Sequence, residues 1–95
     1  MVYIAKNIEK EDIEFLVFPK KPIRLKNRLE QNKIIKRLEN ATTIGNLHHR
    51  KVEITFQDSI GLKKVNTTVW ATGEKYIVLK KGVIIPINRI VQINF

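Results

Sequence analysis

The sequence contains no cysteine, only one serine, and four glycines that stand apart from one another. Without cysteine the chain cannot form a disulfide, a thiolate zinc site or a thiol nucleophile. The serine, Ser59, lies in a predicted turn with no neighbouring base to activate it. Isolated glycines do not form a phosphate-binding loop. We therefore expect a protein that is not an enzyme and that carries no cofactor and no metal.

The chain also lacks a long apolar run. The stretch Val83–Ile87 is far shorter than the ~20 residues that a membrane-spanning helix needs. Charged residues between Lys6 and Glu14 interrupt any signal-peptide core. These features predict a cytoplasmic protein with no membrane partner.

Acidic residues are scarce, so the 95-residue chain carries a net charge of +9. Eight basic residues fall between positions 20 and 37, where Glu30 is the only acid. Clustered lysine and arginine favour binding to the phosphates of DNA or RNA. The alternative is a solvated helix face whose charge only maintains solubility. The candidate nucleic-acid-binding residues are Lys20, Lys21, Arg24, Lys26, Arg28, Lys33, Lys36, Arg37, Arg50 and Lys51.

The chain has the length of one domain, in which we expect an arm at 1–22, a basic helix at 23–40 and a β-unit at 50–95. Ile34, Ile35 and Leu38 recur at helical spacing and predict the buried side of the helix. Asn40 predicts its end, and a loop over 42–49 should follow. In that loop, adjacent histidines at 48 and 49 would point in opposite directions. We interpret them as surface residues, with a metal site or a pH switch as the alternatives.

From Val52 onward apolar residues alternate, and turns recur at short intervals, which predicts five short antiparallel strands. The fold class is therefore α+β, mainly β: an arm and one helix followed by a five-stranded, highly curved small barrel. Tyr76–Leu79 and Val83–Ile85 are apolar on both faces. We expect the helix or the arm to cover the second face, and a homo-oligomer interface is the alternative.

The segment from Lys75 to Ile90 resembles the end of an Sm-like or Src-homology-3-like small barrel, in which one helical turn precedes a last short strand. A helix leading into five bent strands resembles the Sm-like order in particular. The chain is also similar to short uncharacterised bacterial proteins that share the phrases at Thr67–Trp70 and Ile85–Ile90. The acidic and Asn-Gly positions of Sm-type uridine pockets have no counterpart here, so the resemblance implies an architecture and no specific pocket.

Trp70 is the remaining candidate, since alternation places it on the face opposite Val69. An exposed tryptophan there would stack on a base or anchor a partner. The favoured interpretation is that Trp70 packs beneath Ile34, Ile35 and Leu38. The predicted function is non-catalytic nucleic-acid binding with little sequence specificity. The alternative is a protein-interaction or self-assembly module that does not bind nucleic acid.

Overall fold

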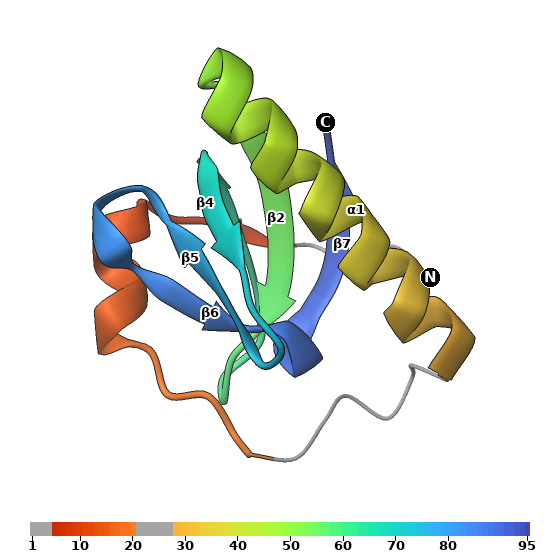
Figure 1. Cartoon of the computed structure of the whole chain (residues 1–95). Coiled ribbons are helices and arrows are strands. Elements are labelled where there is room, and N and C mark those ends of the chain that lie inside the picture. Colours follow the sequence, from red (N-terminus) through yellow and green to blue (C-terminus); the bar gives the residue numbers. More distant parts are fainter. Residues whose placement is uncertain (1–4, 21–27) are drawn as a thin grey trace.

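The computed structural model describes residues 5–20 and 28–95, which form an α+β fold with one α-helix and seven β-strands in two sheets (Figure 1). Short 3-10 helices, labelled η, lie between some of these elements. In chain order the elements are β1 (Lys6–Asn7), η1 (Lys10–Phe15), α1 (Arg28–His48), β2 (Val52–Gln57), β3 (Leu62–Thr67), β4 (Val69–Thr72), β5 (Tyr76–Leu79), η2 (Lys80–Gly82), β6 (Ile84–Pro86), η3 (Ile87–Arg89) and β7 (Ile90–Asn94).

The predicted strand positions after Val52 are confirmed, but the described strands do not close into one five-stranded barrel. They pair as a β1–β3–β2–β7 sheet and a β4–β5–β6 sheet. The second predicted strand is divided at Thr68, which separates β3 from β4. The short β1, in the arm, runs parallel to β3 and is an edge strand of its sheet. The fold is thus α+β with two sheets joined through the bend at Thr68.

The helix α1 is longer than predicted, and the expected loop over 42–49 is wrong. Thr42 and Thr43 lie inside the helix, and their hydroxyls donate to the carbonyls of Leu38 and Glu39, one turn earlier, at 2.9 and 3.1 Å. The helix ends at His48, and His49 follows in the left-handed region with φ 54°. The His49 N–H closes the last turn on the Gly45 carbonyl at 2.9 Å.

Gly45 lies within the segment expected to be a loop, but it is a packing residue of α1. It is buried, and a Cβ at this position would lie 2.6 Å from the Val69 carbonyl oxygen and 2.9 Å from Thr68 Cγ2. Leu38 and Ala41 precede it at helical spacing, and both are fully buried. A narrow stripe of one large and two small residues therefore lets α1 approach β4 closely.

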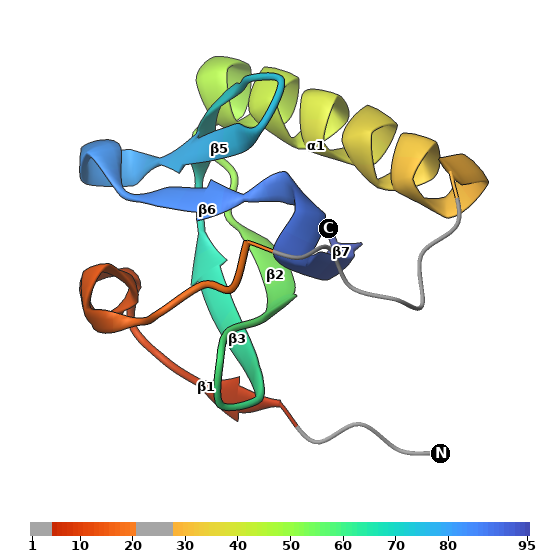
Figure 2. The same ribbon diagram turned by 90° about the horizontal axis from the view of Figure 1, so that it is seen from below.

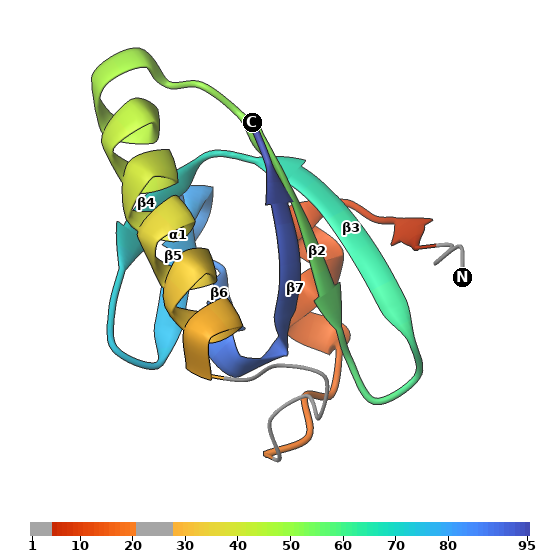
Figure 3. The ribbon, with the colours of Figure 1, turned by 90° about the vertical axis from the view of Figure 1, so that its right-hand side faces the viewer.

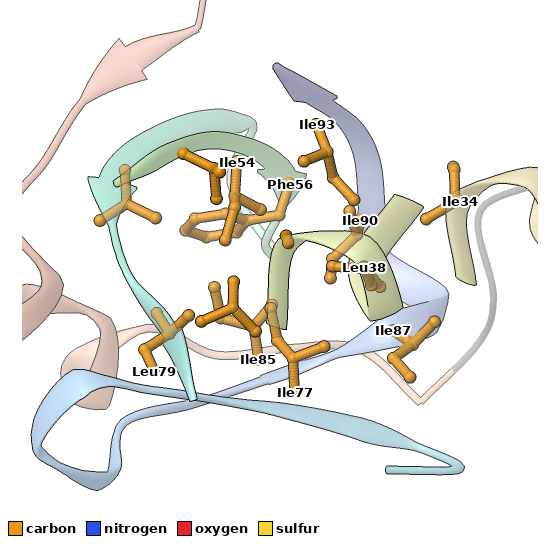
Figure 4. Close-up of a cluster of buried hydrophobic side chains, with 14 of the residues drawn as sticks. Ile34, Leu38, Ile54, Phe56, Ile77, Leu79, Ile85, Ile87, Ile90 and Ile93 are labelled. Atoms are coloured by element: carbon orange, nitrogen blue, oxygen red, sulfur yellow. The ribbon is translucent and has the colours of Figure 1, made fainter. Parts of the chain in front are cut away.

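One hydrophobic core lies between the two sheets and the helix (Figure 4). Ile54 and Phe56 enter it from β2, while Leu38 enters from α1. Ile13 of η1 is also buried in this core, and the rings of Phe18 and Phe56 lie 5.7 Å apart. The part of the arm that the structure describes therefore contributes apolar side chains to the core.

The helix and the arm cover different sides of the sheets. α1 contacts β4 and β7, and Figure 3 shows it lying along these strands. η1 contacts β3 and β6, and Figure 2 shows the arm on the side of the molecule away from α1. Among residues 5–20 and 28–95, no helix is long and apolar enough to cross a bilayer.

Candidate nucleic-acid interface

The predicted basic residues are only partly gathered on one surface. Lys33 and Lys36 lie exposed on α1, facing away from its buried stripe. Arg50 and Lys51 are exposed just after the other end of the helix, where the chain enters β2. Lys20 is exposed in the arm. Of the remaining candidates, Lys21, Arg24, Lys26 and the side chain of Arg28 lie outside the described residues.

Arg37 is exposed on α1 one turn after Lys33, but its guanidinium is directed to the last strand. Its Nη2 donates to the Ile93 carbonyl at 2.9 Å, and its guanidinium lies 5.0 Å from the centre of the Phe95 ring. Position 37 follows Ile34 at a helical spacing that brings it to the flank of the buried stripe, beside β7. Arg37 therefore ties α1 to the last strand, which limits its use as a phosphate contact.

The acidic residues lie only partly apart from these cations, since Glu30 and Glu39 stand on α1 one turn from Lys33 and Lys36. Four of them fall between positions 9 and 14, in and next to η1. The described residues form two ion pairs, Lys10–Glu11 at 3.1 Å and Lys63–Asp58 at 3.0 Å. Neither pair involves Lys33, Lys36, Arg50 or Lys51. The four acids in and next to η1 are Glu9, Glu11, Asp12 and Glu14.

The acidic segment does interact with one lysine of the β5–β6 connection. A backbone N–H and the Lys10 side chain lower the pKa of Glu11, and the positive charge of Lys81 contributes to the same direction. Lys81 stands in η2 with a left-handed φ of 70°, which directs the chain around this turn. Glu11 therefore partly offsets the positive charge of Lys81.

The second apolar face of the β4–β5–β6 sheet stays exposed, so its predicted covering by the helix or the arm is wrong. Tyr76 and Ile84 are 48% and 50% exposed. The residues between and beside them, Ile77, Leu79 and Ile85, are fully buried on the opposite side. α1 packs along β4 instead of across this sheet. We call this surface the outer face; its residues are Trp70, Ala71, Tyr76, Val78, Ile84 and Pro86.

Trp70 belongs to the outer face, and the prediction that it packs beneath the helix is wrong. Its side chain is 46% exposed, while its carbonyl accepts a hydrogen bond from Asn46 Nδ2 of α1 at 3.3 Å. In the β4–β5 pair, Val69 is opposite Leu79 but Ala71 is opposite Val78, so Trp70 is an extra residue in β4. Such a β-bulge redirects the side chains that follow it.

The bulge changes which side of the sheet the residues after Trp70 face. Without it, Ala71 would face the core with Val69. With it, Thr72 turns inward instead, and its hydroxyl lies 2.7 Å from that of Thr42 and 3.2 Å from the Leu38 carbonyl. Trp70 and Ala71 then share the exposed side. A bulge has no signature in this sequence that a period-2 pattern could detect.

A buried polar cluster that the sequence pattern did not reveal joins the β2–β3 turn to η3. Arg89 is only 6% exposed, and its Nε donates to the Gln57 carbonyl at 2.9 Å. Asp58 Oδ1 accepts from the N–H groups of Ile60 and Gly61, both at 2.8 Å, in an Asx turn. These contacts lie within the fold and hold two connections together.

Asp58 remains a carboxylate despite its burial. Burial by itself would raise its pKa, but the N–H groups of Gly61 and Ile60 and the ammonium of Lys63 outweigh that effect. The net result is a lowered pKa. The charge of Asp58 is thus a structural element of the turn, held by donors within a few residues of it.

The cleft beside β1 and the two adjacent histidines are weaker candidates for a binding site. A cleft of about 440 Å³ lies between β1 and η1, where Lys6 and Lys63 face Glu9 and Asp12. Its rim carries both charges, and Lys63 is already paired with Asp58. His48 ends α1 and His49 follows it, both exposed, and the described residues contain no cluster of three or more metal-binding side chains.

Comparisons with protein-family models, with curated proteins and with solved structures find no match for this chain.

Proposed function

We propose that this chain is a non-catalytic nucleic-acid-binding protein with little sequence specificity. The observation that carries the proposal is the set of exposed cations on and just after α1, Lys33 and Lys36 on the helix and Arg50 and Lys51 after it, which take part in neither ion pair of the described residues. Unpaired, solvated ammonium and guanidinium groups can replace the counterions condensed on a phosphate backbone.

Lysine ammonium groups suit contacts to phosphates better than bidentate contacts to base edges. The outward side of the 21-residue α1 carries Lys33 and Lys36, and the exposed amides of Asn32 and Asn40 lie one turn from Lys36, where they could add contacts to base edges. Arg37, the one arginine of α1 whose side chain is described, is bound to Ile93 and Phe95. Phosphate contacts fix position and carry no sequence information directly.

The test is the salt dependence of binding to a labelled DNA duplex, measured by fluorescence anisotropy. The double variant K33Q/K36Q should weaken binding at low salt and reduce the slope of log K against log[salt] by about 0.9 for each lost contact. The matched control is K6Q/K10Q, which removes the same charge from the side that carries β1 and η1. The proposal fails if the unmodified protein binds neither DNA nor RNA at low salt.

The alternative, a protein-interaction or self-assembly module, makes a different prediction for the same preparation. It expects a solution mass well above the 11.1 kDa of one chain and no affinity for nucleic acid. Light scattering on the nuclease-treated protein separates the two functions. A monomer that binds duplex in a salt-dependent manner supports the proposed function, and an oligomer that does not bind supports the alternative.

We infer that the two sheets together correspond to an open small barrel of the Sm-like or Src-homology-3-like kind, in which β3 and β4 count as one bent strand. Two features support it: Thr68 alone separates β3 from β4, and η3 leads directly from β6 into β7. On this count β2, β3–β4, β5, β6 and β7 are the five strands, preceded by α1. The cytoplasmic location expected from the sequence remains part of this proposal.

A further inference from the structure

The outer face of the β4–β5–β6 sheet is an apolar surface on a protein that is otherwise strongly basic. Residues that pair across antiparallel strands project to the same side of the sheet. Ala71, Val78 and Ile84 are paired in this way and form one row across the three strands. Tyr76 is paired with Pro86 in the next row, and the bulge adds Trp70 beside Ala71.

The two aromatic rings of this face are the feature that indicates a ligand. Trp70 and Tyr76 are each about half exposed, at 46% and 48%. Both stand on paired strands, with their backbones fixed by the sheet, so that little conformational entropy would be lost when a flat group stacks on them. Planar aromatic groups are the ligands that such rings bind best.

Charge restricts the ligand further. Lys75 and Lys80 are exposed immediately before and after β5, the strand that carries Tyr76 and Val78. Glu74 is the only acid between positions 69 and 86. A ligand that fits this surface therefore combines flat aromatic groups with negative charges spaced along a flexible backbone.

We infer that the outer face binds the unpaired bases of single-stranded nucleic acid, which stack on Trp70 and Tyr76 while the phosphates lie toward Lys75 and Lys80. This inference rests on the proposed function and adds a preference to it. In a duplex the bases are stacked on one another and their faces are not available, so the outer face selects single strands. The phosphate contacts of α1 make no such selection.

A second copy of the chain fits this face less well. The six residues of the outer face, whose large side chains are at most half exposed, offer much less than the roughly 800 Å² per partner of a stable interface. Two copies meeting face to face would also bring Lys75 and Lys80 of one chain near those of the other, with a net charge of +9 on each.

The chain carries its own probe, because Trp70 is its only tryptophan. We expect a thymidine oligomer of about 15 nucleotides to quench the fluorescence of Trp70 as it binds, since stacking on a base quenches indole. Heparin, a polyanion without bases, should bind without quenching. A duplex of the same length should also bind, through the helix cations, with a much smaller change in fluorescence.

Substitutions test whether the rings of Trp70 and Tyr76 are responsible for the affinity for the oligomer. Trp70→Ala and Tyr76→Ala should each weaken binding of a labelled oligomer by about 5- to 100-fold, as expected for loss of stacking on one base, with heparin binding unchanged. Both side chains are half exposed, so the fold should persist, and Trp70→Phe and Tyr76→Phe keep a ring and should retain most of the affinity. Leu47→Ala, an exposed apolar residue of α1, is the control.

The outcomes separate this inference from the proposed function. If the oligomer binds with no quenching and Trp70→Ala binds it normally, stacking is wrong and phosphate binding stands. If neither the oligomer, the duplex nor heparin binds, the proposed function and the inference fail together. An assembly that Trp70→Ala converts to a monomer, without quenching by the oligomer, would show that the outer face binds a second copy instead.

Discussion

At the scale of single residues, Gly45 decides how closely α1 lies against β4. Alanine is favoured over glycine inside a helix by about 1 kcal/mol. At position 45, however, the added methyl group would meet the Val69 carbonyl at 2.6 Å, and backbone cannot move aside as a side chain does. Overpacking of this kind costs about 1 to 3 kcal/mol, so the contact outweighs the helix preference.

We therefore expect Gly45→Ala to lower the free energy of unfolding by up to about 2 kcal/mol, the overpacking cost less the gain in helix preference. The measurement is urea denaturation followed by far-UV circular dichroism. Gly61→Ala is the matched control, because a Cβ at Gly61 has no neighbour within 4 Å. Gly61→Ala should be neutral or slightly stabilising. Equal effects of the two substitutions would contradict the close approach of helix and strand.

Asp58 is the second residue whose chemistry can be tested, through pH. Its pKa in the folded protein is lowered, so the carboxylate stabilises the fold fully above its unfolded pKa of about 3.9 and less as the pH falls through the folded value. Asp58→Asn keeps an oxygen for the Ile60 and Gly61 N–H groups but loses the charge that faces Lys63.

We expect Asp58→Asn to cost about 1 to 3 kcal/mol at pH 7, as for a lost charge-assisted hydrogen bond. The difference from the unmodified protein should shrink in acid, below pH ~3.9, as Asp58 itself becomes protonated. Urea midpoints at pH 7 and at successively lower pH measure both effects. A difference that stays constant with pH would mean that the charge of Asp58 contributes nothing.

At the scale of elements, α1 is held by a few residues on one side. Leu38 is fully buried, whereas Leu47 on the same helix is 69% exposed. Leu38→Ala should destabilise the protein by about 2 to 5 kcal/mol because it leaves a cavity in the core. Leu47→Ala should change stability by less than about 0.5 kcal/mol. Thermal unfolding of the two variants is the comparison, and similar losses would show that α1 is not docked through its buried stripe.

The strands were predictable from the sequence, and the end of the helix was not, for one physical reason. Alternation from Val52 to Phe56 follows from burial of one face, which a period-2 pattern detects directly. Continuation of α1 past Asn40 depends on Gly45 fitting against Val69, a tertiary contact between distant parts of the chain. Local propensity favours an end there, and packing overrides it.

In the candidate interface too, the sequence predicted the local features but not those that depend on tertiary contacts. The excess of lysine and arginine was visible in the composition, but the attachment of Arg37 to Ile93 was not, because it depends on where β7 lies. Likewise, alternation placed Trp70 opposite Val69 correctly. It could not show whether another element covers that side, since coverage depends on α1 packing along β4 and not across the sheet.

At the scale of the whole molecule, charge is distributed unevenly between two sides. The acids of η1 lie with the arm, and α1 with its lysines lies on the other side of the fold (Figure 2). An approaching polyanion is attracted by α1 and repelled by η1. Over such separations the repulsion acts through solvent, and the Debye length limits it to about 30 Å at 0.01 M salt and about 10 Å at 0.1 M.

Neutralising exposed acids of η1 should therefore strengthen nucleic-acid binding without adding a contact. We expect the double variant E11Q/E14Q to bind a labelled oligomer several-fold more tightly than the unmodified protein near 0.01 M salt. The gain should fade as salt rises above about 0.1 M, because the charges are then screened from the α1 surface. The control E11D/E14D keeps both charges and should bind as the unmodified protein does. A gain that persists at high salt would instead place η1 in direct contact with the nucleic acid, and a loss of affinity would contradict the repulsion altogether.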